Sequence, residues 1–440
     1  MSKSSPAPSQ IWIALPLFIF GFLHLAGALL WLGAEPSLLT GHFYQPRVIA
    51  FAHVMGLGFL MSLVAGSSYQ LLPVAFENPL FSRSLAKIHL VLHVGGVPAM
   101  VYGFMHWQMS VVAVGGTAVL CGFALYILNV AATALRPLRW TPTTAGVFAS
   151  LVSLSFALGV AAWILAAKLG WTAVRDPLAL LGAHTYAILI GFFLLFLAAV
   201  SYTLLPMFLL VPLTSARRAF GSVNYFILAV VLFIPGQLAA PVLLPLAALF
   251  ASLGLGLYSV ENIAAISRSP RRLDGGLRLY TANLAFLLPV AALTLFRALQ
   301  LAGYAPTLAR GLDTLIFTLA VFGTLTCAIL GMGAKIVPFL VWQHRYAPLL
   351  GRAAVPKLSD LVYTRILTAL AWSVPAAGVL LALGVATQSD RTVQCGAGLF
   401  CLSVCAFLAN LLHVLSHLWQ SKEKPFNTTK MPFNAVAIKP

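Results

Sequence analysis

The chain repeats one pattern in Gly58-Phe-Leu-Met-Ser-Leu-Val-Ala-Gly-Ser-Ser-Tyr-Gln-Leu-Leu-Pro73 and in Gly191-Phe-Phe-Leu-Leu-Phe-Leu-Ala-Ala-Val-Ser-Tyr-Thr-Leu-Leu-Pro206. Each stretch begins Gly-Phe, has Tyr eleven residues after the glycine, and ends Leu-Leu-Pro. A third stretch keeps Gly323 and Pro338 at the same separation but lacks the Tyr. The three glycines lie 133 and 132 residues apart, with four apolar runs between successive copies. This spacing predicts three copies of a four-helix unit, the alternative being coincidence among leucine-rich helices.

The composition predicts a protein that lies in lipid. Of 440 residues, 61% are hydrophobic and 8% are charged, and the mean hydropathy is +0.97. A soluble domain has roughly 25% charged residues, so this chain has too few to cover a surface in water. We therefore expect an all-α integral membrane protein with membrane lipid as its partner.

The apolar runs predict twelve transmembrane helices, because about 20 apolar residues cross the hydrocarbon core. The predicted spans are 11–33, 47–72, 87–108, 110–135, 144–168, 180–208, 221–240, 242–266, 279–301, 312–341, 361–385 and 395–419. The first is interpreted as a span rather than a cleaved signal peptide. Residues 1–440 then form one membrane domain of three parallel repeats around a pseudo-threefold axis, at about 11–135, 144–266 and 279–419, followed by a cytoplasmic tail at 420–440.

The net charge of +17 is interpreted as a topology signal and not as a nucleic-acid site. If the N-terminus is inside, 20 of the 26 basic residues fall in cytoplasmic segments. The other six are on the outer side: Arg47, Lys168, Arg175, Arg297, Arg310 and Arg391. Basic residues near span ends face the cytoplasm, so we expect a multi-pass protein of a bacterial-type inner membrane, N-in and C-in.

Histidines carry the predicted chemistry. Eight fall inside predicted spans: His24, His53, His89, His93, His106, His184, His413 and His417. Ionisable groups in the bilayer usually face the bundle interior or a cavity. Carboxylates are almost absent from the spans, with Glu261 the main exception, so a proton or sodium pump lacks its usual groups. Neutral imidazole is the usual protein ligand of haem iron.

The outer histidines are the first candidate ligands. His53 and His184 lie five to seven residues before the repeated glycine, in the outer third of the second and sixth spans. His24 lies in the outer half of the first span, and His106 ends the third. Each is also compatible with a plain hydrogen bond to a neighbouring helix or to water.

The inner histidines form two pairs with i, i+4 spacing, His89 with His93 and His413 with His417. Residues four apart share one helix face, so each pair presents two imidazoles in one direction. Such pairs suit haem ligation, a water-filled cavity or a quinone pocket.

These residues resemble a known superfamily. Three parallel four-helix repeats with histidines near the outer ends of their second helices look like the main subunit of haem–copper oxidases and nitric oxide reductases. The tenth span of C-type oxidases has the pattern His-x-His-x-x-x-x-Gly-Trp, then a small-residue Gly, a Tyr and a Pro. His53, which precedes Gly58, is placed like the second His of that pattern, and His184, which precedes Gly191, like the first. His53-Val-Met-Gly-Leu-Gly58-Phe also resembles the NnrS family, twelve-span haem and copper proteins linked to nitric oxide stress.

The chain departs from the superfamily at the oxygen-reducing site. The tenth span has Ile316 and Thr318 where the repeat aligns the two histidines, and the seventh span has no histidine. The resemblance therefore implies a haem-binding relative without a conventional binuclear centre, and not a standard terminal oxidase or nitric oxide reductase. If it is an enzyme, it is expected to be an oxidoreductase of this superfamily.

The first functional hypothesis is a haem b protein that transfers electrons or responds to a diatomic gas. One haem would lie between His53 and His184, with His24 as a substitute ligand and Arg47 and Arg297 pairing with its propionates. A second haem would take one histidine from each inner pair. Quinol or cytochrome c, with other respiratory subunits, are the expected partners.

Two alternatives remain open. One is a transporter or assembly factor for copper, haem or a small solute, for which four methionines offer soft copper ligands: Met55, Met61, Met207 and Met332. The other is a non-catalytic subunit of a respiratory complex, with its histidines merely hydrogen-bonded.

Overall fold

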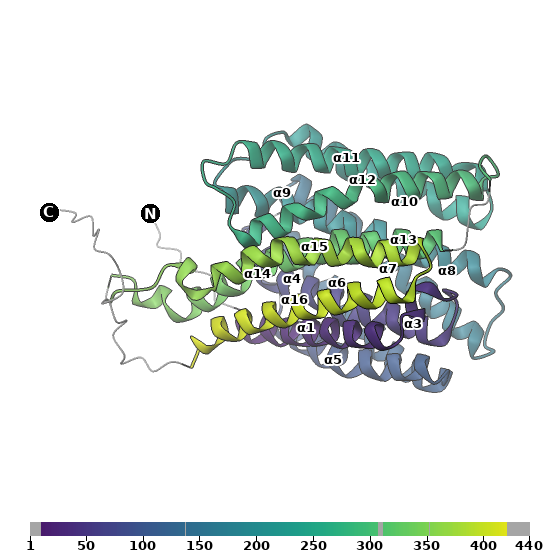
Figure 1. Cartoon of the computed structure of the whole chain (residues 1–440), viewed down its shortest axis with the longest axis horizontal. Coiled ribbons are helices and arrows are strands. Elements are labelled where there is room, and N and C mark those ends of the chain that lie inside the picture. Colours follow the sequence, from purple (N-terminus) through teal and green to yellow (C-terminus); the bar gives the residue numbers. More distant parts are fainter. Residues whose placement is uncertain (1–9, 137, 307–310, 352, 420–440) are drawn as a thin grey trace.

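The computed structural model describes residues 10–136, 138–306, 311–351 and 353–419, and its regular elements in these ranges are all helices (Figure 1). Twelve helical rods are long and apolar enough to cross a membrane. Nine are single helices: α1 (Ile11–Ala34), α5 (Arg83–Met105), α6 (Met109–Ala134), α7 (Pro142–Lys168), α10 (Ala216–Leu238), α11 (Leu244–Ser267), α12 (Gly275–Leu301), α15 (Thr364–Ala386) and α16 (Asp390–Ser416). The chain is therefore an all-α, multi-pass membrane protein, as predicted.

The other three rods, spans 2, 6 and 10, are composite. They comprise α3 (Pro46–His53), η1 (Val54–Met61) and α4 (Ser62–Ala75), then α8 (Pro177–Tyr186), η2 (Ala187–Leu194) and α9 (Leu195–Leu209), then α13 (Leu312–Thr318), η4 (Leu319–Leu325) and α14 (Thr326–Arg345). Short helices lie in the connections: α2 (Ser37–Thr40), η3 (Pro241–Leu243), η5 (Ala347–Leu349) and η6 (Leu358–Leu361).

The predicted span ends are wrong by a few residues. The last span was expected at 395–419, but α16 begins at Asp390, where the Ser389 side chain accepts a hydrogen bond from the Thr392 amide. An N-cap starts the helix before the apolar run does. His106 and His417, expected inside spans, are the residues just after α5 and α16. The expected tail at 420–440 lies outside the described residues.

The middle segments of the composite spans, η1, η2 and η4, are π-helical. They begin at Val54, Ala187 and Leu319, which are 133 and 132 residues apart, the same separations as the repeated glycines. A π turn widens the helix and frees a backbone carbonyl. Because lipid offers no hydrogen-bond donor, such a carbonyl needs a partner within the protein.

Hydroxyl side chains supply that partner in two of the three spans. Ser62 donates to the carbonyls of Gly58 and Leu57, at 2.7 and 3.1 Å. Thr326 donates to the carbonyl of Val321, five residues back, at 2.7 Å. These hydroxyls compensate for the widened turns inside the bundle.

Each repeated glycine accommodates a side chain from another helix. A Cβ atom at Gly58 would lie 2.7 Å from Cγ of His24 on α1, and one at Gly191 would lie 2.7 Å from Oγ of Ser153 on α7. A Cβ atom at Gly323 would lie 2.8 Å from Cε1 of Phe286 on α12. Only glycine permits these contacts without a shift of the helices.

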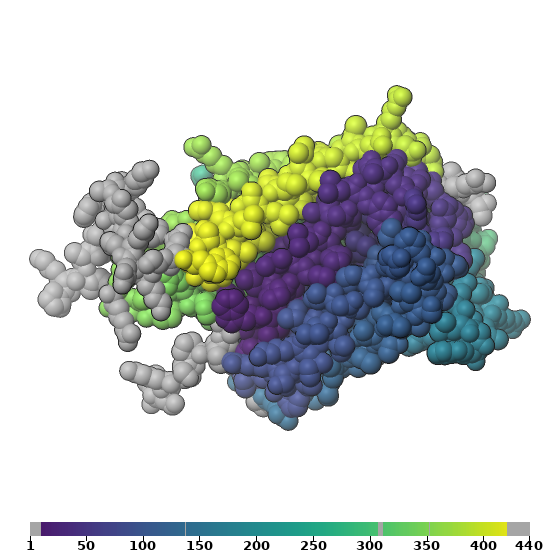
Figure 2. Space-filling view, turned by 90° about the horizontal axis from the view of Figure 1, so that it is seen from below, coloured from purple at the N-terminus to yellow at the C-terminus, as the bar shows by residue number. Residues whose placement is uncertain are grey.

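The order of packing recurs along the chain. α5 packs on α6, α10 on α11 and α15 on α16. The helices α1, α7 and α12 each pack on the composite span that follows them. The contacts α6–α7, α11–α12 and α16–α1 join these groups into a ring, and Figure 2 shows the first and last helices side by side.

A buried polar side chain near the end of α6, α11 and α16 binds the N-cap of the helix before it. Asn129 accepts a hydrogen bond from the Ser82 amide at 3.0 Å, and Asn410 accepts one from the Tyr363 amide at 2.7 Å. In α11 the acceptor is the Glu261 carboxylate, 3.0 Å from the Ser215 amide. The helix starts are thereby fixed at one end of the bundle.

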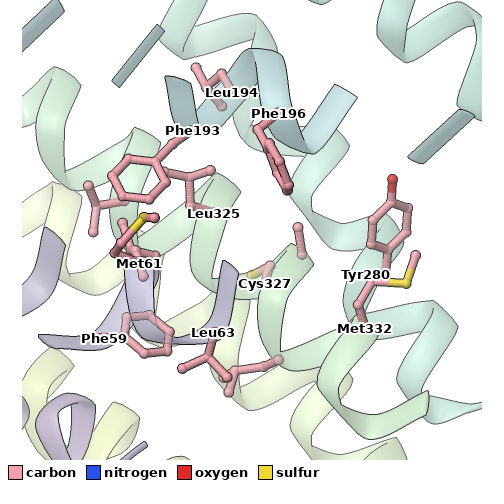
Figure 3. Packing of buried hydrophobic residues seen from close by; sticks show 14 of the residues in the cluster. Phe59, Met61, Leu63, Phe193, Leu194, Phe196, Tyr280, Leu325, Cys327 and Met332 are labelled. Carbon is pink, nitrogen blue, oxygen red and sulfur yellow. The ribbon is translucent and has the colours of Figure 1, made fainter. Parts of the chain in front are cut away.

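The composite spans meet in the apolar centre. Figure 3 shows Met61 of span 2 close to Phe193 of span 6 and Leu325 of span 10. Phe59 is fully buried, as are its equivalent Phe192 and the neighbouring Phe322 of span 10. The start of α1 and the end of α16 lie at the same end of this bundle, as an even number of crossings requires (Figure 1).

Adjacent glycines on α5 provide a test of helix packing. A Cβ atom at Gly96 would lie 2.9 Å from the Gly115 carbonyl oxygen of α6, whereas one at Gly95 meets nothing within 4 Å. We expect Gly96→Ala to destabilise the protein by about 1–3 kcal/mol, because the helices must move apart. Gly95→Ala should be neutral or stabilising by up to about 1 kcal/mol, since alanine favours helix. Thermal unfolding in detergent measures both, and equal effects would contradict this packing.

Candidate functional site

His24, His53 and His184 share one hydrogen-bonding pattern. Nδ1 of His24 lies 2.8 Å from the Phe20 carbonyl oxygen and Nδ1 of His53 lies 2.7 Å from the Ile49 carbonyl oxygen. Nδ1 of His184 is 2.9 Å from the carbonyl oxygen of Ala157 on α7. A carbonyl only accepts, so each Nδ1 carries the proton and each Nε2 has a free lone pair. Within the part of the chain that the structure describes, these Nε2 atoms make no hydrogen bond.

This pattern suits iron or another metal. A metal-ligating histidine commonly donates its other ring N–H to a backbone carbonyl, which fixes the tautomer and the ring orientation. The carbonyls of Phe20 and Ile49 belong to the histidine's own helix, while that of Ala157 belongs to a neighbouring one.

His53 and His184 occupy corresponding places in two spans. His53 is the last residue of α3, directly before η1, and His184 lies three residues before η2. Both are half-buried, and they are near enough to interact electrostatically. The ring of His53 also stacks on Phe104 of α5, with 4.7 Å between centroids. The structure brings the two predicted ligands into one neighbourhood, while a shared cavity between them stays a prediction.

His24, on α1, lies against the π-helical segment η1 of span 2. Its ring contacts Gly58 in the π-helical segment and packs on Phe20, with 4.0 Å between ring centroids. It is also near enough to His93 to interact electrostatically. His106, by contrast, is exposed and packs only on Tyr102.

The two arginines predicted to pair with propionates already have acidic partners. Arg47 donates to both oxygens of Glu35 at 3.0 and 2.9 Å, and Arg297 donates to both oxygens of Asp313 at 2.8 Å. Pairing with propionates would require these ion pairs to exchange.

The inner pair His89/His93 lies in a buried polar cluster of the first four spans. Nε2 of His93 is 2.8 Å from the Ser62 hydroxyl, and Nδ1 of His89 is 2.9 Å from the Tyr69 hydroxyl. The two rings are 5.5 Å apart. His89 Nε2 and His93 Nδ1 are buried and have no hydrogen-bond partner, so each keeps unused hydrogen-bonding capacity.

The other inner pair lies elsewhere. Nδ1 of His417 forms a hydrogen bond of 2.7 Å with the Tyr346 hydroxyl. The ring of His413 stacks on Tyr363, with 4.2 Å between centroids. Nε2 of His417 is buried without a partner. Each inner pair thus belongs to its own cluster with its own tyrosine, which gives no support to a haem held by one histidine of each.

Sequence reasoning missed the hydroxyl partners of the inner pair. Tyr69 is the tyrosine of the repeated Gly-to-Pro motif, so the motif itself was the available signal. Ser62 precedes it by seven residues and has no counterpart in the second copy, where Leu195 stands. Tyr126 bonds Ser68 at 2.9 Å and extends the cluster toward Asn129.

Comparison with known proteins identifies no relative. No known family matches the chain, and no curated protein matches it in sequence. Among the described residues, no group of three or more histidine, cysteine or acidic side chains is placed to hold a metal ion. The class of protein is therefore established only as a twelve-span helical membrane protein with paired buried histidines.

Glu35 provides a pH-dependent contact at the C-terminal end of α1. Burial alone would raise the pKa of its carboxyl group, but hydrogen bonds from Trp31 and Arg47 outweigh burial and lower the pKa below its usual value. The Trp31 indole nitrogen is 3.0 Å from the carboxylate.

A lowered folded-state pKa means that ionised Glu35 stabilises the protein above its unfolded pKa, and that this stabilisation is lost as pH falls through the folded pKa. We expect Glu35→Gln to lower the Tm at pH 7, and the gap from wild type to close as pH falls below about 4.3. Thermal unfolding across this range measures the gap. In a protein that already has Arg47→Gln, the further substitution Glu35→Gln should lower the Tm at neutral pH by less. A Tm difference between wild type and Glu35→Gln that does not change with pH would contradict the assignment.

Proposed function

We propose that the protein binds haem b through its outer histidines and serves electron transfer or a response to a diatomic gas. The observation that carries the proposal is the shared pattern of His24, His53 and His184, each with Nδ1–H anchored on a carbonyl and Nε2 free. If these histidines served only as hydrogen-bonding groups, nothing would favour the same free nitrogen on all three imidazoles.

We further propose that the chain is three parallel four-helix repeats around a pseudo-threefold axis, similar to the haem–copper oxidase main subunit. Three observations support it: the π-helical segments recur with the glycines, each repeated glycine faces the first helix of its own unit, and the order of packing recurs.

In this proposal His53 and His184 would hold the haem, and His24 would be the substitute. Their Nε2 lone pairs fit the requirement of haem iron for neutral imidazole. The backbone carbonyls of Ile49 and Ala157 hold the two rings in the ligating tautomer. When bound, haem would supply a one-electron centre that also takes up diatomic gases. Ile316 and Thr318 offer no imidazole, so conventional oxygen reduction is not proposed.

The surroundings of the proposed site follow from the same placement. Arg47 and Arg297 lie near outer span ends and would exchange their carboxylate partners for propionates.

The partners proposed are quinol or cytochrome c and other respiratory subunits, and any turnover would be that of an oxidoreductase of the haem–copper superfamily. Copper and the second haem at the inner pairs stay hypotheses without a supporting contact.

Removal of a proposed haem ligand tests the proposal. We expect purified wild-type protein to show haem bands in a reduced-minus-oxidised spectrum. His53→Ala and His184→Ala should each lose most of this signal, because each removes one of the two imidazoles that would hold the haem. His106→Ala is the matched control, since that exposed histidine has no carbonyl anchor, and it should keep the spectrum.

Haem bands that survive both substitutions would place the ligands elsewhere, with the inner histidines the next candidates. A wild-type protein without haem bands, after expression with haem supplied, would overturn the function itself.

The N-in, C-in orientation in an inner membrane is likewise proposed from the distribution of basic residues. In a variant without native cysteines, Arg271→Cys should be protected from a membrane-impermeant thiol reagent in intact cells. Trp171→Cys, in an exposed loop at the other end of the bundle, should react. The reverse labelling would contradict the orientation.

A further inference from the structure

A groove of about 480 Å³ lies beside the first turns of α10, where this helix packs on α11. It is lined by Arg217, Gly221, Asn224, Tyr225 and Leu228 of α10 and by Leu257 of α11. Its lining changes along α10 from a cation at the helix start to apolar side chains. Arg217 and Leu228 are eleven residues apart, or about 16 Å of helix rise.

The cation at the start of this groove is free to bind a ligand. Arg218 also borders the groove, but its guanidinium is held by Glu261 at 2.9 Å and by the Thr214 hydroxyl at 2.8 Å. Arg217 is exposed and makes no hydrogen bond or ion pair with any residue that the structure describes. One unpaired guanidinium therefore lies at the membrane boundary, above an apolar surface.

Glycine opens the groove. A Cβ atom at Gly221 would lie 3.0 Å from Cδ1 of Leu257, so any larger side chain would fill the space between α10 and α11. The ring of Tyr225 is fixed by stacking on Phe250, with 5.7 Å between centroids. Asn224 is exposed and adds a polar group seven residues, or about two helical turns, after Arg217.

We propose that this groove binds an anionic phospholipid. The phosphate would pair with Arg217, since guanidinium binds phosphate oxygens through charge-assisted hydrogen bonds. Asn224 and Tyr225 would contact the polar glycerol region, and an acyl chain would lie along Leu228 and Leu257. Basic pockets between membrane helices recognise such headgroups. The binding does not depend on haem, whereas its assignment to the cytoplasmic leaflet rests on the proposed orientation.

Native mass spectrometry of the full-length protein in detergent tests this site, with dioleoylphosphatidylglycerol and dioleoylphosphatidylcholine as probes. We expect tighter binding of the anionic lipid, and Arg217→Gln should weaken that binding about fivefold, the effect of about one basic residue near a charged surface. Gly221→Leu should abolish the bound lipid by filling the groove. Arg83→Gln, which removes an exposed arginine in the first turn of α5, should change nothing.

Three outcomes would overturn the proposal. Equal losses in Arg217→Gln and Arg83→Gln would show a general surface-charge effect. Equal binding of the two lipids, unchanged by Arg217→Gln, would show an apolar groove without headgroup recognition. Displacement of the anionic lipid by millimolar inorganic phosphate alone would identify a soluble anion as the ligand.

Discussion

The structure depends on a constraint that lipid imposes, namely that every backbone polar group inside the hydrocarbon must find its partner within the protein. The widened turns η1, η2 and η4 work against that constraint at the centre of the bundle. They are kept because neighbouring groups compensate, most clearly the Ser62 hydroxyl bonded to the Gly58 carbonyl. Glycine at the same turn lets a side chain of the preceding helix enter, so widening and close packing occur together.

This arrangement also places the histidines. His53 directly precedes η1, His184 lies three residues before η2, and the His24 ring lies against Gly58. A π turn shifts the direction of the following side chains relative to a regular helix. In spans 2 and 6 the π turn therefore changes the direction of the following side chains relative to His53 and His184, which links the fold to the proposed haem site.

The buried polar cluster around His89 and His93 is a second consequence. Its members come from three helices, with Ser62 and Tyr69 on span 2, the histidines on α5 and Tyr126 on α6. Polar groups buried in a membrane bundle are costly unless paired. Two ring nitrogens remain without a partner here, so this cluster keeps hydrogen-bonding capacity that the proposed outer site does not use.

The sequence by itself determined the number of spans, the all-helical class and the recurrence of the Gly-to-Pro segments, because hydropathy and glycine spacing are local properties of the chain. It also picked out the histidines as the polar groups to examine. It did not locate the helix start at Asp390, since a cap rather than apolarity begins that helix. For His184, only the tertiary structure decided which ring nitrogen is free, because its Nδ1 bonds the carbonyl of Ala157, 27 residues away in the chain. It also decided that the two inner pairs lie in separate clusters and that Arg47 and Arg297 already have carboxylate partners, since such contacts arise only when distant helices pack together.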